Sequence, residues 1–431
     1  MNTPRQVAPG EMPALVLSGL AFFFILTAYY IVRPVRDQLS GAVGSTSLPL
    51  FYAITLAAML LLTPLFGWLV SRFPRRRLLG WSYGFFILCL IGFIPAFVAQ
   101  DRIGARELGT VFFVWVSVFN LFVVSLFWSF MADVFDSGQA RRLFPVIALG
   151  GMGGALFGPA VTSLLVKVLG VAPLLVVSAI TLSLALLLLL KLSTREDIRH
   201  EAEGGGEAAI GGSLWAGIRD AWSQPFLRYM AILMLLSDGV GTLAYTLVAD
   251  YAKANYHDNA ARTAFYAHLD LAINLLGALM QVTVTRWLLV RFGAGWGLVV
   301  PSLINLALLL VVAAFGAIDI RILGFVVPLL AIMQVVTRGT AYGMTKPASD
   351  ALYTRVAREA RYKGKNFIET AVWRFGDLIV TSGVNLLHGV GVGLAGLAMI
   401  CAGFSGIAAY IGRRAGTAPD LLPERRDPAD A

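Results

Sequence analysis

The sequence predicts an all-helical membrane protein with twelve transmembrane helices arranged as two six-helix bundles. Hydrophobic residues make up 58% of the 431 positions, and charged residues only 14%. The mean hydropathy of +0.76 lies well above that of soluble domains, in which about half of the residues are apolar. A chain of this length accommodates about a dozen helical spans of roughly 20 residues each.

Twelve apolar runs follow one another along the chain, and each is long enough to cross a bilayer. The expected spans are 13–33, 49–70, 80–99, 110–134, 144–168, 171–191, 226–249, 263–289, 295–315, 322–344, 366–388 and 391–411.

A polar segment separates the sixth span from the seventh and divides the chain into two halves. It contains the run STREDIRHEAEGGGEAAIGG, whose charge and glycine content cannot form a packed core. A short amphipathic helix at 214–222 is expected to rest on the membrane surface. The expected organisation is therefore an N-terminal bundle (1–191), a cytoplasmic linker (192–225), a C-terminal bundle (226–412) and a flexible cytoplasmic tail (413–431).

The distribution of lysine and arginine predicts that both termini are cytoplasmic, in a plasma (inner) membrane. With this orientation the inside segments hold 23 of these residues and the outside loops hold eight, a ratio that follows the positive-inside rule. The eight outside cations are Arg33, Arg36, Arg102, Arg106, Lys167, Lys253, Arg262 and Arg321. The loop cations account for most of the net charge of +9, so no nucleic-acid partner is expected.

The two halves resemble each other weakly. Residues 68–74 (WLVSRFP) after the second span are similar to residues 287–293 (WLLVRFG) after the eighth, and Ala140-Arg141 before the fifth span matches Ala360-Arg361 before the eleventh. Internal repeats of this kind are typical of transporters in which two bundles move about a binding site at the membrane midplane.

In the loop after the second span, residues 67–77 read GWLVSRFPRRR. This run resembles the signature of the major facilitator superfamily, glycine-x-leucine-x-aspartate-arginine-x-glycine-arginine-arginine. Ser71 stands where that signature has an acidic residue, and Pro74 where it has glycine. The resemblance implies the twelve-helix facilitator fold and a gating role for Arg72. The alternative is an ordinary positive loop.

The end of the first span carries a compact set of charged and aromatic residues. Arg33 and Arg36 are three residues apart and share a helix face, and Asp37 lies four residues after Arg33, within pairing reach. We expect the two arginines and the preceding Tyr29 and Tyr30 to lie at a cavity mouth, where guanidinium groups bind phosphate oxygens and a tyrosine ring stacks on a base. The alternative is an anchor at the membrane interface.

Other polar residues stand at the end of the fourth span and within the eighth. Asp133, Asp136 and Arg141 are expected to form part of a cytoplasmic gate, or else a solvated loop. The glycines at 150–158 are expected to allow close helix packing. Asp270 shares a helix face with Asn274 and Gln281, and this polar face should point into the bundle as a source of counter-charge.

The stretch 338–377 is the most charged part of an otherwise apolar chain, with twelve charged residues in forty. Charged groups at membrane depth are costly unless they are paired or hydrated, so they indicate a functional site. The pattern predicts three cations that contact an anion and three carboxylates that act as counter-charges, or alternatively a set of structural ion pairs. These residues are Arg338, Lys346, Arg374, Asp350, Glu369 and Asp377.

Three segments carry a second resemblance: residues 30–37 (YIVRPVRD), 127–128 (FW) through 140–145 (ARRLFP), and 346–353 (KPASDALY) with 362–369 (YKGKNFIE). Together they resemble the nucleotide transporter family of ATP/ADP translocases and nucleoside triphosphate/diphosphate exchangers. The resemblance places Arg36 where that family has a lysine used for substrate phosphates, and Asp350 where it has a cavity glutamate. Ser349 departs from the pattern by replacing a lysine.

The sequence therefore predicts a secondary transporter, not an enzyme, that moves an organic anion by alternating access. A nucleotide in ATP/ADP-type exchange is the expected substrate, the lipid bilayer the only other partner, and no cofactor or metal is expected. The chain should be a monomer. The alternatives are a proton-coupled facilitator for another solute, such as a sugar phosphate, a peptide or an exported compound, and a membrane-embedded enzyme or assembly factor.

Overall fold

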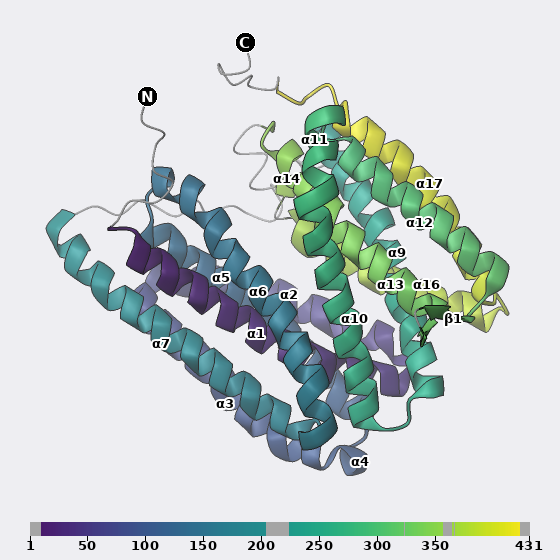
Figure 1. The fold of residues 1–431 in the computed structure, drawn as a ribbon, viewed down its shortest axis with the longest axis horizontal. Coiled ribbons are helices and arrows are strands. Elements are labelled where there is room, and N and C mark those ends of the chain that lie inside the picture. The colour runs from purple at the N-terminus through teal and green to yellow at the C-terminus, as the bar shows by residue number, and fades with distance from the viewer. Residues whose placement is uncertain (1–9, 204–223, 323, 357–363, 366, 423–431) are drawn as a thin grey trace. The chain divides into compact units, whose positions relative to one another are not determined.

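The computed structural model describes residues 10–203, 224–322, 324–356, 364–365 and 367–422, and these are almost entirely helical (Figure 1). By contacts the chain forms two compact units. The first unit comprises Met1–Val43, Ala57–Ala209 and Ala252–Leu271, and the second comprises Gly44–Leu56, Ile210–Tyr251 and Ala272–Ala431. Each unit thus includes a short segment from the other half of the sequence, and division of the bundles at the linker stays a prediction.

The N-terminal half of the chain contains seven α-helices and a short 3-10 turn among its described residues. They are α1 (Met12–Val43), η1 (Ser45–Ser47), α2 (Leu48–Arg72), α3 (Arg75–Val98), α4 (Gln100–Ile103), α5 (Ala105–Val134), α6 (Ser137–Leu169) and α7 (Ala172–Glu203).

The C-terminal half is more irregular, since three π-helical turns (η2, η3 and η4) interrupt its helices. Its elements are α9 (Pro225–Asn255), α10 (Asn259–Met280), η2 (Gln281–Thr285), α11 (Arg286–Phe292), α12 (Trp296–Phe315), β1 (Asp319–Ile322), β2 (Phe325–Pro328), α13 (Leu329–Thr340), η3 (Ala341–Thr345), α14 (Lys346–Tyr353), η4 (Ile368–Val372), α16 (Trp373–Gly389) and α17 (Leu394–Gly416).

Ten helices of the described chain are long and apolar enough to cross a membrane. The runs from α13 to α14 and from η4 to α16 correspond to the remaining two expected spans, although π turns interrupt them and they carry charged residues. The predicted all-helical membrane fold class is therefore confirmed, and twelve spans are consistent with these elements.

Three predicted boundaries were wrong. The first span was expected to end at Arg33, but α1 continues through Pro34 to Val43, so its charged residues lie inside the helix. The span expected at 322–344 begins as an antiparallel hairpin in which Asp319 pairs with Pro328, and its helix starts only at Leu329. The linker expected from residue 192 is helical as far as Glu203, while the surface helix expected at 214–222 lies outside the described residues.

In the first unit, α1 packs against α5, α6 and α7. The contact with α6 depends on glycine, because a Cβ atom at Gly154 would overlap the carbonyl oxygen of Phe23. At Gly158 a Cβ atom would lie 2.9 Å from the carbonyl oxygen of Thr27. The prediction that these glycines serve helix packing is confirmed, since small residues let two membrane helices approach closely.

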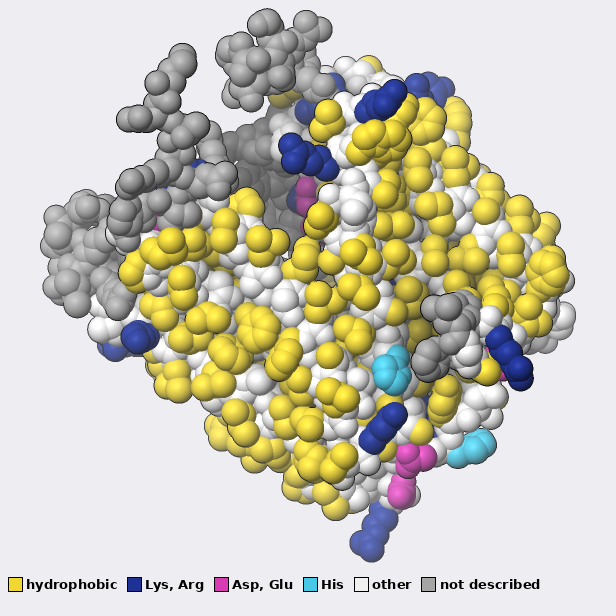
Figure 2. All heavy atoms as spheres, in the orientation of Figure 1, with side chains coloured by type: hydrophobic (Ala, Val, Ile, Leu, Met, Phe, Trp, Pro, Cys, Tyr) yellow, Lys and Arg dark blue, Asp and Glu magenta, His cyan; other side chains and the backbone are white. Residues whose placement is uncertain are grey.

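Hydrophobic side chains dominate the visible surface of the molecule, and charged side chains gather toward the ends of helices (Figure 2). Many large apolar residues on the helices are exposed, including Leu61 at 76%, Val168 at 82% and Val290 at 82%. Apolar exposure on this scale is unfavourable in water and is the surface expected of helices that contact lipid.

Candidate functional site

The second unit contains a cavity of about 260 Å³ between its helices. Residues of α9, α12, α13, α14, η3, η4 and the start of α16 line it. Its wall combines apolar side chains such as Met230 and Leu233 with the aromatic side chains of Tyr342 and Trp373 and with two ion pairs. An apolar cavity with a few polar groups is the usual form of a small-molecule site.

The irregular backbone beside the cavity is explained by a proline. Pro347 has no N–H, so the helix cannot form the hydrogen bond to the carbonyl four residues earlier, that of Gly343. Thr285 compensates by donating its hydroxyl to this carbonyl at 2.7 Å. The amide of Gln281 donates to the neighbouring carbonyl of Tyr342 at 3.0 Å. The π turn η3 is thus held by side chains of η2, and such turns are frequent at functional sites.

Two ion pairs line the cavity. The guanidinium of Arg338 on α13 lies 2.5 Å from the carboxylate of Asp238 on α9, and the two side chains are only 11% and 14% exposed. Lys346 at the start of α14 contacts Glu369 in η4 at 2.5 Å. The predicted site omitted Asp238, although its position in an apolar run was a signal that could have included it.

Lys346 and Glu369 belong to a larger cluster of four charges. Asp350 lies 3.4 Å from Lys346 and 2.7 Å from Lys365, and Lys365 is 3.9 Å from Glu369. The side chains of Lys346 and Asp350 are 49% and 44% exposed, so this cluster is accessible while the Arg338–Asp238 pair is buried.

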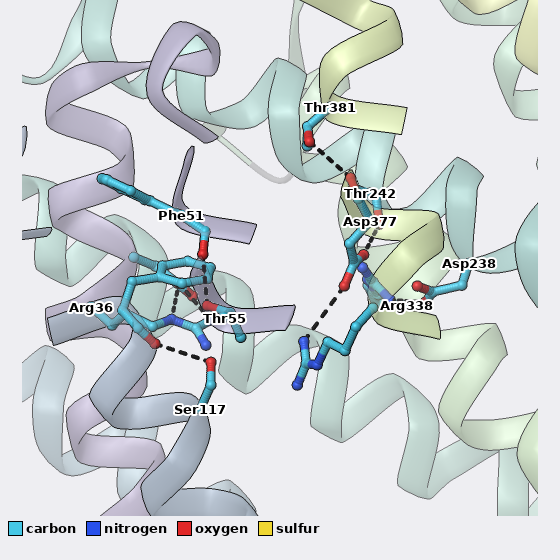
Figure 3. A network of polar contacts seen from close by, with 12 residues as sticks. Arg36, Phe51, Thr55, Ser117, Asp238, Thr242, Arg338, Asp377 and Thr381 are labelled. Atoms are coloured by element: carbon cyan, nitrogen blue, oxygen red, sulfur yellow. Dashed lines mark hydrogen bonds and ion pairs between the residues drawn. The ribbon is translucent and has the colours of Figure 1, made fainter. Parts of the chain in front are cut away.

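Asp377 on α16 is buried near Arg338 and Asp238 (Figure 3). Its carboxylate accepts a hydrogen bond from Thr242 on α9 at 2.5 Å and lies 3.5 Å from Arg374. The π turn at Ile368–Val372 precedes α16, and Asp377 lies one helical turn after Trp373 on that helix. Glu369 and Trp373 line the cavity, whereas neither Asp377 nor Arg374 does.

The first unit contains a second buried cluster around α1. Arg36 lies 2.7 Å from Asp37, which is 3.8 Å from Arg33. Arg33 is also 3.4 Å from Asp270 on α10, and the guanidinium of Arg36 stacks over the ring of Phe113 at 4.6 Å. α1 continues past these residues, and both arginine side chains are only 12% exposed, so their place at a cavity mouth stays a prediction.

The two predicted stacking tyrosines contact protein groups. Tyr29 and Tyr30 meet edge to face with ring centroids 5.1 Å apart. Tyr29 also approaches Phe119, and the guanidinium of Arg33 lies 5.6 Å from the Tyr30 ring. Both tyrosines therefore contribute to packing around α1.

The predicted gate residues do not form a single cluster among their described side chains. Arg72 is exposed, with its guanidinium 6.0 Å from the ring of Trp68, and Asp133 is exposed near the end of α5. Asp136 is the N-cap of α6, where its carboxylate accepts hydrogen bonds from the backbone N–H groups of Gly138 and Gln139. The side chain of Arg141 lies outside the described part.

Acids and bases balance in the clusters of both units. Arg33 and Arg36 accompany Asp37 and Asp270 in the first unit. In the second unit the bases are Arg338, Arg374, Lys346 and Lys365, and the acids are Asp238, Asp377, Asp350 and Glu369. Within the residues that the structure describes, no group of three or more His, Cys, Asp or Glu side chains could hold a metal ion.

Solved transporter structures are similar to this chain over almost its whole length. A nucleoside transporter, NupG, matches with a TM-score of 0.65 at 14% identity, over 95% of this chain and 99% of that one. A bacterial homologue of the iron transporter ferroportin in an inward-facing state matches with a TM-score of 0.64 at 14% identity, over 95% and 100%. A D-xylose-proton symporter matches with a TM-score of 0.62 at 12% identity, over 96% and 98%.

No protein-family model matches the chain, and no curated protein sequence matches it. The similarity to solved structures therefore concerns the fold, and the predicted resemblance to the ATP/ADP translocases is not confirmed. The chain has the major facilitator fold.

Proposed function

We propose that this protein is a secondary transporter that moves a small organic solute across a membrane by alternating access. The observation that carries this proposal is the cavity of the second unit, in which Arg338–Asp238 and Lys346–Glu369 are placed between helices of membrane-spanning length. Ionised groups at this depth are costly and are typical of substrate and ion pathways. The major facilitator fold, shared with transporters of nucleosides and xylose, supports the same function.

An organic anion, and a nucleotide in particular, is the first candidate for the solute. Lys346 and Lys365 are 49% and 30% exposed beside the cavity, and Trp373 and Tyr342 line its wall. A phosphate group could take the place of Glu369 and Asp350 as the partner of these lysines, while a base lies against an aromatic ring. The released carboxylates would then supply the counter-charges.

The charge balance favours a second candidate, a solute without net charge carried together with a proton. Every basic residue of the two clusters already has an acidic neighbour within 4 Å. A polyanion would therefore add uncompensated negative charge to a low-dielectric site. A neutral or zwitterionic solute adds none, and protonation of a carboxylate is then available as the coupling step.

The two candidates are separated by transport into proteoliposomes that contain the purified full chain. Nucleotide exchange predicts uptake of labelled ATP that requires ADP inside the vesicles and is independent of a pH gradient. The second candidate predicts uptake of an uncharged solute that responds to an imposed pH gradient. Lys346→Gln should abolish either flux, whereas Arg413→Gln, at the end of α17 and away from the cavity lining, should not. Flux of neither kind would refute transport as proposed.

We also propose that both termini are cytoplasmic in the plasma membrane, and that the chain functions as a monomer. Since Arg33 and Arg36 lie within α1, they are removed from the eight expected outside cations. Six outside cations against 23 inside strengthen the positive-inside argument. Labelling of single cysteines placed at residues 5 and 430 in sealed cells tests this orientation, and labelling from outside would contradict it.

A further inference from the structure

Three uncharged polar side chains of the cavity have buried atoms that lack a hydrogen-bond partner within the described residues. They are the Oδ1 of Asn305 on α12, the hydroxyl of Thr337 on α13 and the hydroxyl of Tyr353 on α14. The three side chains line the same cavity and are only 5%, 2% and 2% exposed. Buried polar atoms are nearly always hydrogen-bonded, and these three lie in the wall of one cavity.

Two neighbouring hydroxyl groups of the cavity wall differ from these three in having partners. Nearby hydroxyls on the same helices are used within the protein, since Ser302 donates to the carbonyl of Leu298 at 3.0 Å and Thr340 to that of Val336 at 2.8 Å. The charged residues of the cavity are also paired with one another. The remaining hydrogen-bonding capacity of the wall is therefore uncharged, and it comes from three different helices.

We propose that Asn305, Thr337 and Tyr353 form a subsite for the hydroxyl groups of an uncharged solute that has one apolar or aromatic face. This inference rests on the proposed transport function and specifies its substrate class. The Oδ1 of Asn305 accepts a hydrogen bond, while the two hydroxyls can each donate and accept. The apolar side chains of Met230, Leu233 and the other lining residues suit the opposite face of such a molecule.

If these hydroxyl groups serve a ligand and not the fold, their removal should not lower the stability of the unliganded protein. Thr337→Val and Tyr353→Phe remove an unpaired polar atom with little change in shape, so the unliganded protein should keep or slightly increase its melting temperature. Substitution of a hydroxyl that is used within the fold should instead lower it. Thr246→Val is the matched control, because Thr246 is fully buried on α9 and donates to the carbonyl of Thr242 at 2.7 Å.

The test measures the melting temperature of the purified full chain in the presence of each probe. The probes form pairs whose two members differ by one phosphate group. The pairs are adenosine with AMP, uridine with UMP, and phenyl glucoside with its 6-phosphate. We expect at least one uncharged probe to raise the melting temperature and its phosphorylated partner to raise it less. Asn305→Leu, Thr337→Val and Tyr353→Phe should each weaken that binding about tenfold, the effect of one lost hydrogen bond.

A variant outside the cavity separates this effect from general changes in the fold. Ser405 on α17 is also buried and unpaired but does not line the cavity, so Ser405→Ala should bind the probe as the natural chain does. Equal or stronger binding of the phosphorylated probes, unchanged binding by all three cavity variants, or no shift with any uncharged probe would overturn the subsite. Binding without flux in proteoliposomes would refute transport and leave the subsite standing.

Discussion

The buried Arg338–Asp238 pair allows a quantitative test of the cavity. Replacing Arg338 by glutamine leaves Asp238 and the nearby Asp377 without the guanidinium that lies between their helices. Removal of one partner from a buried pair costs about 3–5 kcal/mol. For a unit of about 200 residues, each kcal/mol corresponds to roughly 2–4 °C, so Arg338→Gln should lower the melting temperature by about 6–20 °C.

The other single variant and the double variant make the test specific. Asp238→Asn should cost less than Arg338→Gln, because Arg338 keeps a weaker electrostatic interaction with Asp377. In the double variant Arg338→Gln/Asp238→Asn, two neutral amides replace two charges. At least half of the decrease in melting temperature caused by Arg338→Gln should therefore be recovered.

The assay is thermal unfolding of detergent-solubilised protein at one fixed heating rate, since membrane proteins often unfold irreversibly. Arg286→Gln, which removes an exposed arginine at the start of α11, serves as the control and should change stability by less than about 0.5 kcal/mol. If the losses of the two single variants simply add in the double variant, the two side chains do not act as a pair and the reasoning is refuted.

Three further outcomes are expected. Lys346→Glu should lose proteoliposome flux, and the double variant Lys346→Glu/Glu369→Lys, which exchanges the charges of the pair, should regain part of it. If the double variant is as inactive as Lys346→Glu, the position of each charge matters and the pairing does not. Arg36→Ala should abolish transport while the protein still inserts, because Asp37 loses its 2.7 Å partner; normal uptake would exclude α1 from the transport mechanism. Gly154→Ala should destabilise the contact of α6 with α1, because the added Cβ meets the backbone of Phe23, whereas at Gly153 the nearest atom is 3.4 Å away. Melting temperatures of Gly154→Ala and Gly153→Ala compare the two, and equal values would contradict the packing argument.

Local pairing was predictable where it depended on spacing along an unbroken helix. The pairing of Arg33 with Asp37, of Lys346 with Asp350 and of Arg374 with Asp377 is expected from separations of three or four residues, and the structure contains all three. Pairing between helices was not predictable in the same way. Asp238 lies 100 residues before Arg338, and only the tertiary fold brings the two residues together in the wall of one cavity.

The membrane environment, the fold class and the count of twelve spans could be predicted from the amino-acid sequence. The reason is that a long apolar run with few charges is stable only in the bilayer. The glycines of α6 also predicted where two helices pack closely. Only the tertiary structure shows which charges face the cavity, since helices from distant parts of the chain form its wall. It also decided the ion pairs between distant parts of the chain, which are Arg33 with Asp270, Arg338 with Asp238 and Lys346 with Glu369.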